Sequence, residues 1–312
     1  MATLISKNYR LGGTRSRYMP LLFLLPGLFL YILIAFGPSL ATIGYSFTDA
    51  TGLRGLPINW VGFENYDRFL FRGAASTNNI EALQRTLIFS FFVTTIQFSF
   101  GLLLALLLNR KLRGRSIFRT LFFMPVILGV VIQGLMWKLF LLPRGGPMST
   151  AFGWFGLQSE FLGGEPREAF IWVIVVQIWA NVGITMVIFL AGMQSIPDDL
   201  YEAARVDGAG GWQLFKNITW PQLTPAVNTN LLLNIIGSLQ AWTLFLVLVG
   251  YKTGTQVLGY VVFAEGFGQT GGVGSFRQGY AAAASVVLFI LVMIFGLSAN
   301  WFVNRRERKY LG

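Results

Sequence analysis

Six long apolar runs constrain the fold of this 312-residue chain more than any other feature. A helix needs about 20 mostly apolar residues to cross the hydrocarbon core of a membrane. Hydrophobic residues make up 54% of the chain and charged residues only 12%, against roughly 25% charged in soluble domains. The sequence therefore predicts an all-α membrane protein with six transmembrane helices, over residues 20–47, 85–108, 117–142, 169–193, 226–250 and 279–303.

The distribution of positive charge predicts how these helices are oriented. If both termini lie in the cytosol, 15 of the 24 Lys and Arg residues fall on the cytosolic side and 8 on the outer side. Lys138 lies near the outer end of the third run and can extend its ammonium outward. An excess of positive residues marks the cytosolic side of a membrane protein, so we expect cytosolic N and C termini. The net charge of +11 is then a topology signal, and we expect no nucleic-acid partner.

The same runs divide the chain into four parts. We expect a basic cytosolic tail over 1–19, the first helix with an outer loop over 20–84, a core of five helices over 85–303, and a second basic tail over 304–312. A polar cytosolic loop over 194–225 interrupts the core.

The composition excludes several kinds of chemistry. The chain has no Cys and no His, which excludes disulfides, Cys or His metal sites, and nucleophiles activated by His. It also has no G-x-x-x-x-G-K-[ST] phosphate-binding loop. We therefore expect no enzyme activity, no catalytic residue, no metal and no cofactor in this chain.

The cytosolic loop contains the sequence SIPDDLYEAARVDGAGGWQLFKNITWPQL, residues 195–223. Ser195 and Pro197 favour the start of a helix, and the acidic residues that follow suit the positive end of its dipole. Gly208 tolerates positive φ and predicts a turn after this helix. The apolar residues Trp212, Phe215 and Ile218 predict a second short helix. An amphipathic loop lying on the membrane is an alternative, but such helices favour Lys and Arg on their polar face.

The loop resembles the signature of permease subunits of bacterial binding-protein-dependent ABC importers. Glu202-Ala203-Ala204, Gly208, Ile218 and Pro221 match it in every spacing, and Trp220 replaces the usual Leu. The segments WVGFENYDRFL and IFLAGMQSIPDDLYEAARVDGA are similar to the sugar-uptake branch related to maltose and glycerol-3-phosphate permeases. The segment VGYKTGTQ departs from the Gly-Gly-Pro of many relatives, so the resemblance does not identify the sugar.

The resemblance implies a type I ABC importer permease fold in a bacterial cytoplasmic membrane. It implies a second homologous permease, an extracytoplasmic solute-binding protein and two ATP-binding subunits, which would hold ATP and Mg, with lipid around the helices. The first helix of the loop would couple the chain to an ATP-binding subunit, through Asp199, Glu202, Ala203, Ala204, Asp207 and Gly208.

Polar residues at helical spacing predict where a solute crosses. Polar side chains in a membrane face the bundle interior or a water-filled cavity, and amides and hydroxyls match sugar hydroxyls. We expect the substrate path along Gln177, Asn181 and Thr185 in the fourth run, Asn234, Ser238 and Trp242 in the fifth, and Gln133 and Trp137 in the third. Such residues also join transmembrane helices by hydrogen bonds, so helix packing is the alternative role.

These observations predict an importer that takes up a carbohydrate, with an oligosaccharide expected, by ATP-driven alternating access. The runs have no Asp or Glu deep inside, which disfavours a proton-coupled transporter and suits a neutral solute. An importer for glycerol 3-phosphate or another small polar solute is the alternative; a phosphate would need Arg or Lys in the path. A membrane enzyme would need clustered carboxylates or His, and a scaffold would leave the polar stripes unexplained.

Overall fold

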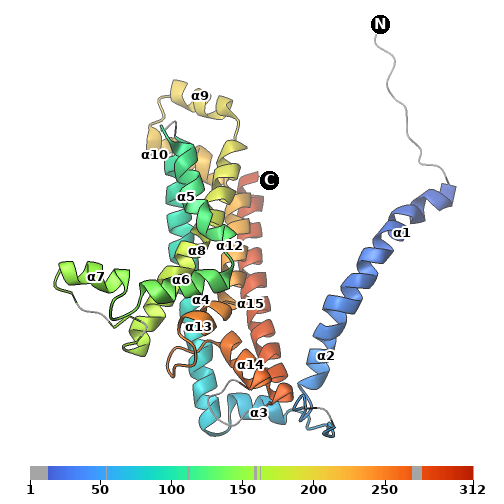
Figure 1. Ribbon diagram of the computed structural model, residues 1–312. Coiled ribbons are helices and arrows are strands. Elements are labelled where there is room, and N and C mark those ends of the chain that lie inside the picture. The colour runs from blue at the N-terminus through green and yellow to red at the C-terminus, as the bar shows by residue number, and fades with distance from the viewer. Residues whose placement is uncertain are drawn as a thin grey trace.

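The computed structural model describes residues 13–53, 55–110, 113–157, 160–161, 163–268 and 276–311. Over this part of the chain the regular secondary structure is helical. One isolated antiparallel bridge joins Thr48 and Trp60, and there is no strand. The long helices α4 (Gly73–Asn109), α8 (Pro166–Gln194), α12 (Thr224–Leu239) and α15 (Gln278–Leu311) form the bundle in Figure 1. The predicted all-α fold class is confirmed.

Four helical segments among the described residues are long and apolar enough to cross a membrane: Leu22–Tyr45, Ser76–Asn109, Pro166–Gln194 and Gln278–Val303. A bent pair of helices makes a fifth if it is one span. The chain is therefore a multi-pass membrane protein. The prediction of six continuous helices needs correction at the third and fifth runs, which are both broken.

The third run folds as α5 (Arg115–Ile127) and α6 (Val130–Phe140), with a bend of 102° between them. Pro125 lies in the last turn of α5 and has no N–H to donate, and Leu128 and Gly129 are extended. The Gln133 side chain donates from Nε2 to the carbonyl oxygens of Pro125 and Leu128, at 2.7 and 2.9 Å. The break therefore leaves these two carbonyls hydrogen-bonded.

The fifth run also folds as two helices. After α12 ends at Leu239, three residues precede α13 (Thr243–Leu248), and a further loop leads to α14 (Leu258–Phe267). Gly237 lies in the last turn of α12, two residues before the helix ends. Both breaks leave irregular backbone within the bundle.

The first run stands beside the bundle in Figure 1. It consists of α1 (Gly13–Tyr31), a π-helical turn η1 (Ile32–Phe36) and α2 (Gly37–Tyr45). None of its apolar window is buried, and α2 contacts α15. Most of its apolar surface is therefore left for lipid or another protein.

The two ends of the bundle differ. At one end lies the predicted cytosolic loop, as α9 (Asp198–Val206), α10 (Gly211–Leu214), the π-helical turn η2 (Phe215–Thr219) and α11 (Trp220–Gln222). At the other end lie α3 (Glu64–Leu70), α13 and α14, while α7 (Pro147–Trp154) projects sideways (Figure 1). The C-terminal end of α15 points toward the end that carries α9, as cytosolic placement of both requires.

The helices on either side of α9 pack against α4. A buried apolar cluster joins these helices. It contains Leu104, Ala105 and Leu108 of α4 and Met186 and Phe189 of α8, and Leu223 and Ala226 at the start of α12 complete it. This packing fixes the relative position of α4, α8 and α12, and the polar residues of these helices lie at their mutual contacts and beside the two breaks.

Candidate substrate cavity and coupling loop

A cavity of about 250 Å³ lies where the two broken runs meet α8. The broken third run contributes Val126, Leu128, Val130 and Gln133; the region around the second break contributes Gly237, Gln240, Ala241, Trp242, Thr243 and Leu244. Gln177 and Asn181 reach it from α8. We name it the amide cavity after four of its side chains, those of Gln133, Gln177, Asn181 and Gln240.

The amide cavity lies near the middle of α8. Gln177 is 11 residues from the first residue of this helix and 17 from the last, or roughly 17 and 26 Å at 1.5 Å per residue. Asn181 donates from Nδ2 to the carbonyl of Gln177, at 3.0 Å. None of the residues that line the cavity carries a charge. Amide groups both donate and accept hydrogen bonds, which suits a neutral polyhydroxylated solute.

Thr185, Asn234 and Ser238 of the predicted path form hydrogen bonds between helices, together with Asn230 and with residues of α4. We call this set the polar seam; it contains Ser90, Thr94 and Gln97 of α4, Thr185 of α8, and Asn230, Asn234 and Ser238 of α12. Gln97 Nε2 donates to Asn234 Oδ1 at 2.8 Å and to Thr185 Oγ1 at 3.0 Å. The hydroxyls of Ser90 and Ser238 lie 2.7 Å apart.

The predicted path residues therefore separate into two groups. Gln133, Gln177, Asn181 and Trp242 line the amide cavity, whereas Thr185, Asn234 and Ser238 are buried in the polar seam. Trp137 lines neither; its ring packs edge to face on Trp179, with centroids 5.4 Å apart. The structure therefore divides each predicted stripe between the cavity and another environment, and Trp242 lies beyond the end of α12.

The predicted substrate path included neither Gln240 nor any residue of α4. Gln240 follows the last residue of α12, where helical spacing no longer predicts a neighbour. Ser90, Thr94 and Gln97 follow the i, i+4, i+7 pattern of one helical face. That pattern was the available signal for an α4 contribution.

The loop between α8 and α12 folds as the predicted helix, turn and helix. Gly208 has φ +81°, and the N–H of Ala209 donates to the carbonyl of Ala204 at 2.9 Å while that of Gly208 donates to Arg205 at 3.0 Å. This pair of bonds is a Schellman motif, which needs a left-handed residue and so favours Gly. The predicted turn at Gly208 is confirmed.

The predicted coupling residues lie on the outermost helix of this end. Asp199, Glu202, Ala203, Asp207 and Gly208 are exposed, and Ala204 is half-buried. The Tyr201 hydroxyl lies 3.0 Å from Thr219 Oγ1 and joins α9 to η2. A groove of about 580 Å³ separates α9 from η2 and the end of α4, with Arg110, Asp198 and Arg205 in its lining. The loop thus presents a polar surface to the space beyond the bundle.

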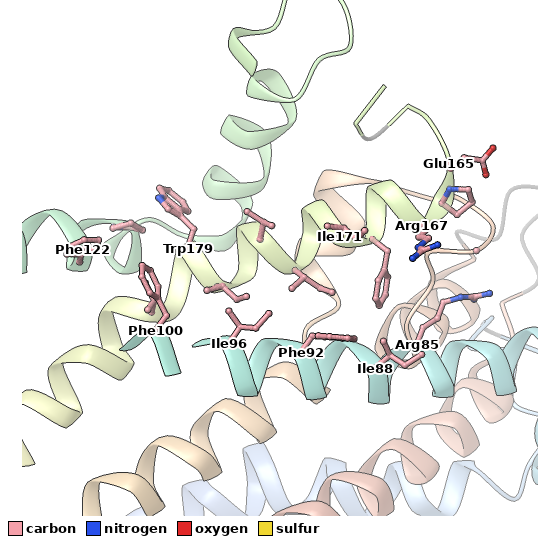
Figure 2. Close-up of a pocket in the computed structure, with 18 of the residues that line it drawn as sticks. Arg85, Ile88, Phe92, Ile96, Phe100, Phe122, Glu165, Arg167, Ile171 and Trp179 are labelled. Carbon is pink, nitrogen blue, oxygen red and sulfur yellow. The ribbon is translucent and has the colours of Figure 1, made fainter. Parts of the chain in front are cut away.

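A larger groove lies elsewhere, between α4, α5 and α8, with about 1350 Å³. Figure 2 shows Ile88, Phe92 and Ile96 of α4 facing Ile171 and Trp179 of α8, with Arg85 and Arg167 at one end. Its lining is almost entirely apolar along the helices and provides few hydrogen-bond partners for a sugar. Its chemistry suits lipid or another helix, so the amide cavity is the better candidate for a polar solute.

Comparison with known proteins agrees with this architecture. The chain is 32% identical to a probable ABC transporter permease from Pyrococcus horikoshii, over 90% of this chain and 95% of the relative. It is 29% identical to a probable permease for starch degradation products from Thermoanaerobacterium thermosulfurigenes, over 92% and 94%.

A solved structure shares the fold. A chain of a bacterial ABC transporter involved in the import of the acidic polysaccharide alginate matches with a TM-score of 0.77 and 25% identity, over 93% of this chain and 96% of that one. The predicted type I importer permease fold is thereby confirmed. Residues 97–310 match the model of the binding-protein-dependent transport system inner membrane component family, and the chain belongs to that family.

Proposed function

We propose that this chain is a transmembrane permease subunit of an ATP-driven importer and passes a carbohydrate through the amide cavity by alternating access. The meeting of both broken runs at that cavity carries the proposal. Irregular backbone at membrane depth occurs where it is buried in protein or lines a water-filled cavity, and broken helices surround the binding sites of many transporters. Here both breaks contribute residues to one uncharged, amide-lined space.

A carbohydrate fits the lining of this space better than an anion does. Its hydroxyl groups match the amides of Gln177, Asn181 and Gln240. Gln133 offers its Oε1 as an acceptor, because its Nε2 already donates to two backbone carbonyls. A glycerol 3-phosphate would require a guanidinium or ammonium group, and the residues around the amide cavity include neither. Lys138 is exposed on α6 and does not line the cavity. The relative named for starch degradation products also favours a carbohydrate.

The exposed face of α9 is suited to receive an ATP-binding subunit. Its helix begins with Asp198 and Asp199 and ends at the Gly208 turn. In this proposal the ATP-binding subunits hold ATP and Mg, and this chain has no enzyme activity of its own. A second permease completes the path, and an extracytoplasmic binding protein delivers the sugar at the end that carries α3 and α14. The complex lies in a bacterial cytoplasmic membrane, with both termini of this chain in the cytosol.

Substitution in the amide cavity tests the proposed substrate path. In the complete importer reconstituted in proteoliposomes, Gln177→Leu and Asn181→Leu should each reduce sugar uptake several-fold, because each lost hydrogen bond is worth about 0.5–1.5 kcal/mol. Val187→Leu, on the exposed side of α8, is the matched control. Assembly is measured by co-purification of all subunits. Full uptake by both amide variants in an intact complex would refute the assignment.

Substitution in α9 tests the coupling role separately. Glu202→Lys and Gly208→Arg should abolish sugar-stimulated ATP hydrolysis while the chain still folds and inserts. Asn217→Ala, an exposed change in η2, controls for general damage to the loop. Unchanged stimulation in both α9 variants would show that the ATP-binding subunits dock elsewhere.

A further inference from the structure

A second cavity of about 320 Å³ adjoins the amide cavity on another side of Trp242. Its lining includes Gln240 and Trp242 from the break, Gly259, Phe263 and Phe267 from α14, and Leu288 from α15. We call it the aromatic cavity. Gln240 and Trp242 line both cavities, so the two spaces share a wall.

The aromatic rings of this cavity form a continuous row. Trp242 and Phe263 stack with ring centroids 4.6 Å apart and an angle of 22° between their planes. Phe263 and Phe267 follow at 5.1 Å and lie one helical turn apart on α14. Phe267 is 65% exposed, so the end of the row is open.

Gly259 explains how Trp242 can lie against α14. A Cβ at this position would lie 3.1 Å from Trp242 Cβ and 3.4 Å from its Cδ1, which is tighter than most real contacts. Gly259 precedes Phe263 by one turn on the same face of the helix. The missing side chain therefore lets the Trp242 ring approach α14 closely enough to stack on Phe263.

The two cavities offer complementary chemistry. A sugar ring has hydroxyl groups around its edge and an apolar face of C–H groups. The four amides of the first cavity suit the hydroxyl groups, and the aromatic faces of the second suit the C–H face. Ligand pockets for drug-sized molecules measure about 300–1,000 Å³, so each cavity is at or below the lower end of this range and the two together fall within it.

We propose that the aromatic cavity is a second sugar subsite, which packs the C–H face of one ring on Phe263 and Phe267 while a neighbouring ring occupies the amide cavity. This inference rests on the proposed function and extends it, because two adjoining subsites select a substrate of two or more rings over a monosaccharide. A lipid chain and a helix of the second permease are the competing occupants of an apolar cavity at this depth.

Cysteine accessibility distinguishes these occupants. The natural chain has no Cys, so Phe267→Cys introduces the only thiol of this subunit. In the reconstituted importer with its binding protein, we expect a water-soluble thiosulfonate reagent to label this thiol. Maltotriose should slow the labelling at least about threefold, and glucose should slow it less. The control is Phe71→Cys, an exposed position at the end of α3, outside the membrane spans and outside the cavity, whose labelling maltotriose should leave unchanged.

The labelling of Phe267→Cys shows whether sugar, lipid or the second permease occupies the aromatic cavity. A Phe267→Cys thiol that the reagent does not reach would show that lipid or the second permease covers the cavity, and it would overturn the inference. Labelling that neither sugar slows would overturn it as well. Wild-type uptake of glucose, maltose and maltotriose is measured first; if the intact importer takes up none of these or any other sugar of a wider oligosaccharide panel, the proposed function fails and this inference fails with it.

A second pair of variants tests the aromatic face itself. Phe267→Leu keeps an apolar side chain and removes the ring, whereas Phe267→Trp keeps an aromatic face. A stacking contribution of the usual size corresponds to about a two- to tenfold loss of maltotriose uptake in the Leu variant, with uptake largely kept in the Trp variant. Equal uptake by the two variants would show that the ring contributes nothing beyond its apolar surface and would overturn the subsite, while leaving the proposed function intact.

Discussion

The polar seam predicts a measurable coupling between α4 and α12. Gln97 and Asn234 are both buried, at 4% and 6% exposure, and Gln97 Nε2 donates to Asn234 Oδ1 at 2.8 Å. Replacing each residue by Leu, singly and together, gives a double-mutant cycle for this bond. The cycle matters because a single substitution here changes more than one interaction.

The expected magnitudes follow from the bonds that each variant loses. Hydrogen bonds between transmembrane helices average about 0.6 kcal/mol and reach about 1.7, so a short buried bond should give a coupling energy near 1 kcal/mol. Gln97→Leu also loses the bond to Thr185, so we expect a total destabilisation of about 1–2 kcal/mol. Asn234→Leu also loses a bond, the one that Asn234 Oδ1 accepts from Thr185 Oγ1 at 3.3 Å. It should still cost less, because Asn234 Nδ2 has no partner among the described residues and its removal relieves a desolvation cost.

The assay is the free energy of unfolding of the detergent-purified chain, titrated in mixed micelles and followed by tryptophan fluorescence. The control cycle pairs Gln177→Leu with Asn234→Leu, since Gln177 lines the amide cavity and makes no bond to Asn234. We expect its coupling energy to be near zero. A Gln97–Asn234 coupling below about 0.3 kcal/mol, or an equal coupling in the control cycle, would refute the assignment of these residues to an interhelical seam.

Three further predictions concern other contacts. Gly183→Ala should destabilise the chain by about 1–3 kcal/mol in the same unfolding titration, because the added Cβ would lie 2.3 Å from the backbone oxygen of Phe122 in α5; Gly153→Ala, which meets nothing within 4 Å, is the control. Gln133→Leu should cost a similar amount, about 1–3 kcal/mol, since it removes the side-chain donor from the Leu128 carbonyl and leaves the Pro125 carbonyl with the Leu128 N–H alone; an unchanged unfolding free energy would contradict the capping role. In the loop that follows α2, hydrogen bonds from the Asn59 side chain and backbone lower the pKa of Asp49 below its ordinary value of about 3.9. The support that these bonds give the loop is complete above about pH 4 and is lost as the pH falls through the lowered pKa. Limited pepsin cleavage between Asp49 and Asn59 should therefore rise over that range, and Asp49→Asn should remove the pH dependence.

The sequence predicted the elements whose information is local. Apolar length placed the long helices, and the acidic start and the Gly208 turn placed α9, because helix dipoles and left-handed turns depend on residues close in the chain. The break in the third run also had a local signal in Pro125, which a count of apolar residues ignores. The break after Leu239 has a weaker local signal in Gly237, because Gly is also frequent inside unbroken transmembrane helices.

The division of the polar stripes depended on tertiary packing. Helical spacing shows that Gln177, Asn181 and Thr185 share a face, but it does not show what that face meets. In the structure α4 covers Thr185, and the break in the fifth run leaves Gln177 and Asn181 open to a cavity. Phe263 and Phe267 were missed for a related reason: α14 has only ten residues, too few to be predicted as a membrane helix.

The two helices that leave the α9 loop differ in mechanical continuity. α8 runs unbroken for 29 residues, about 44 Å, and passes the amide cavity on its way to the far end of the bundle. α12 has 16 residues, about 24 Å, and stops at Leu239 beside that cavity. A displacement of α9 along the bundle axis would therefore move the whole length of α8 as a rigid body. The same displacement of α12 would end at the break, where it would move the backbone of Gln240 and Trp242. One movement of the loop would thus shift one wall of the cavity as a whole and deform the opposite wall at a single compliant point.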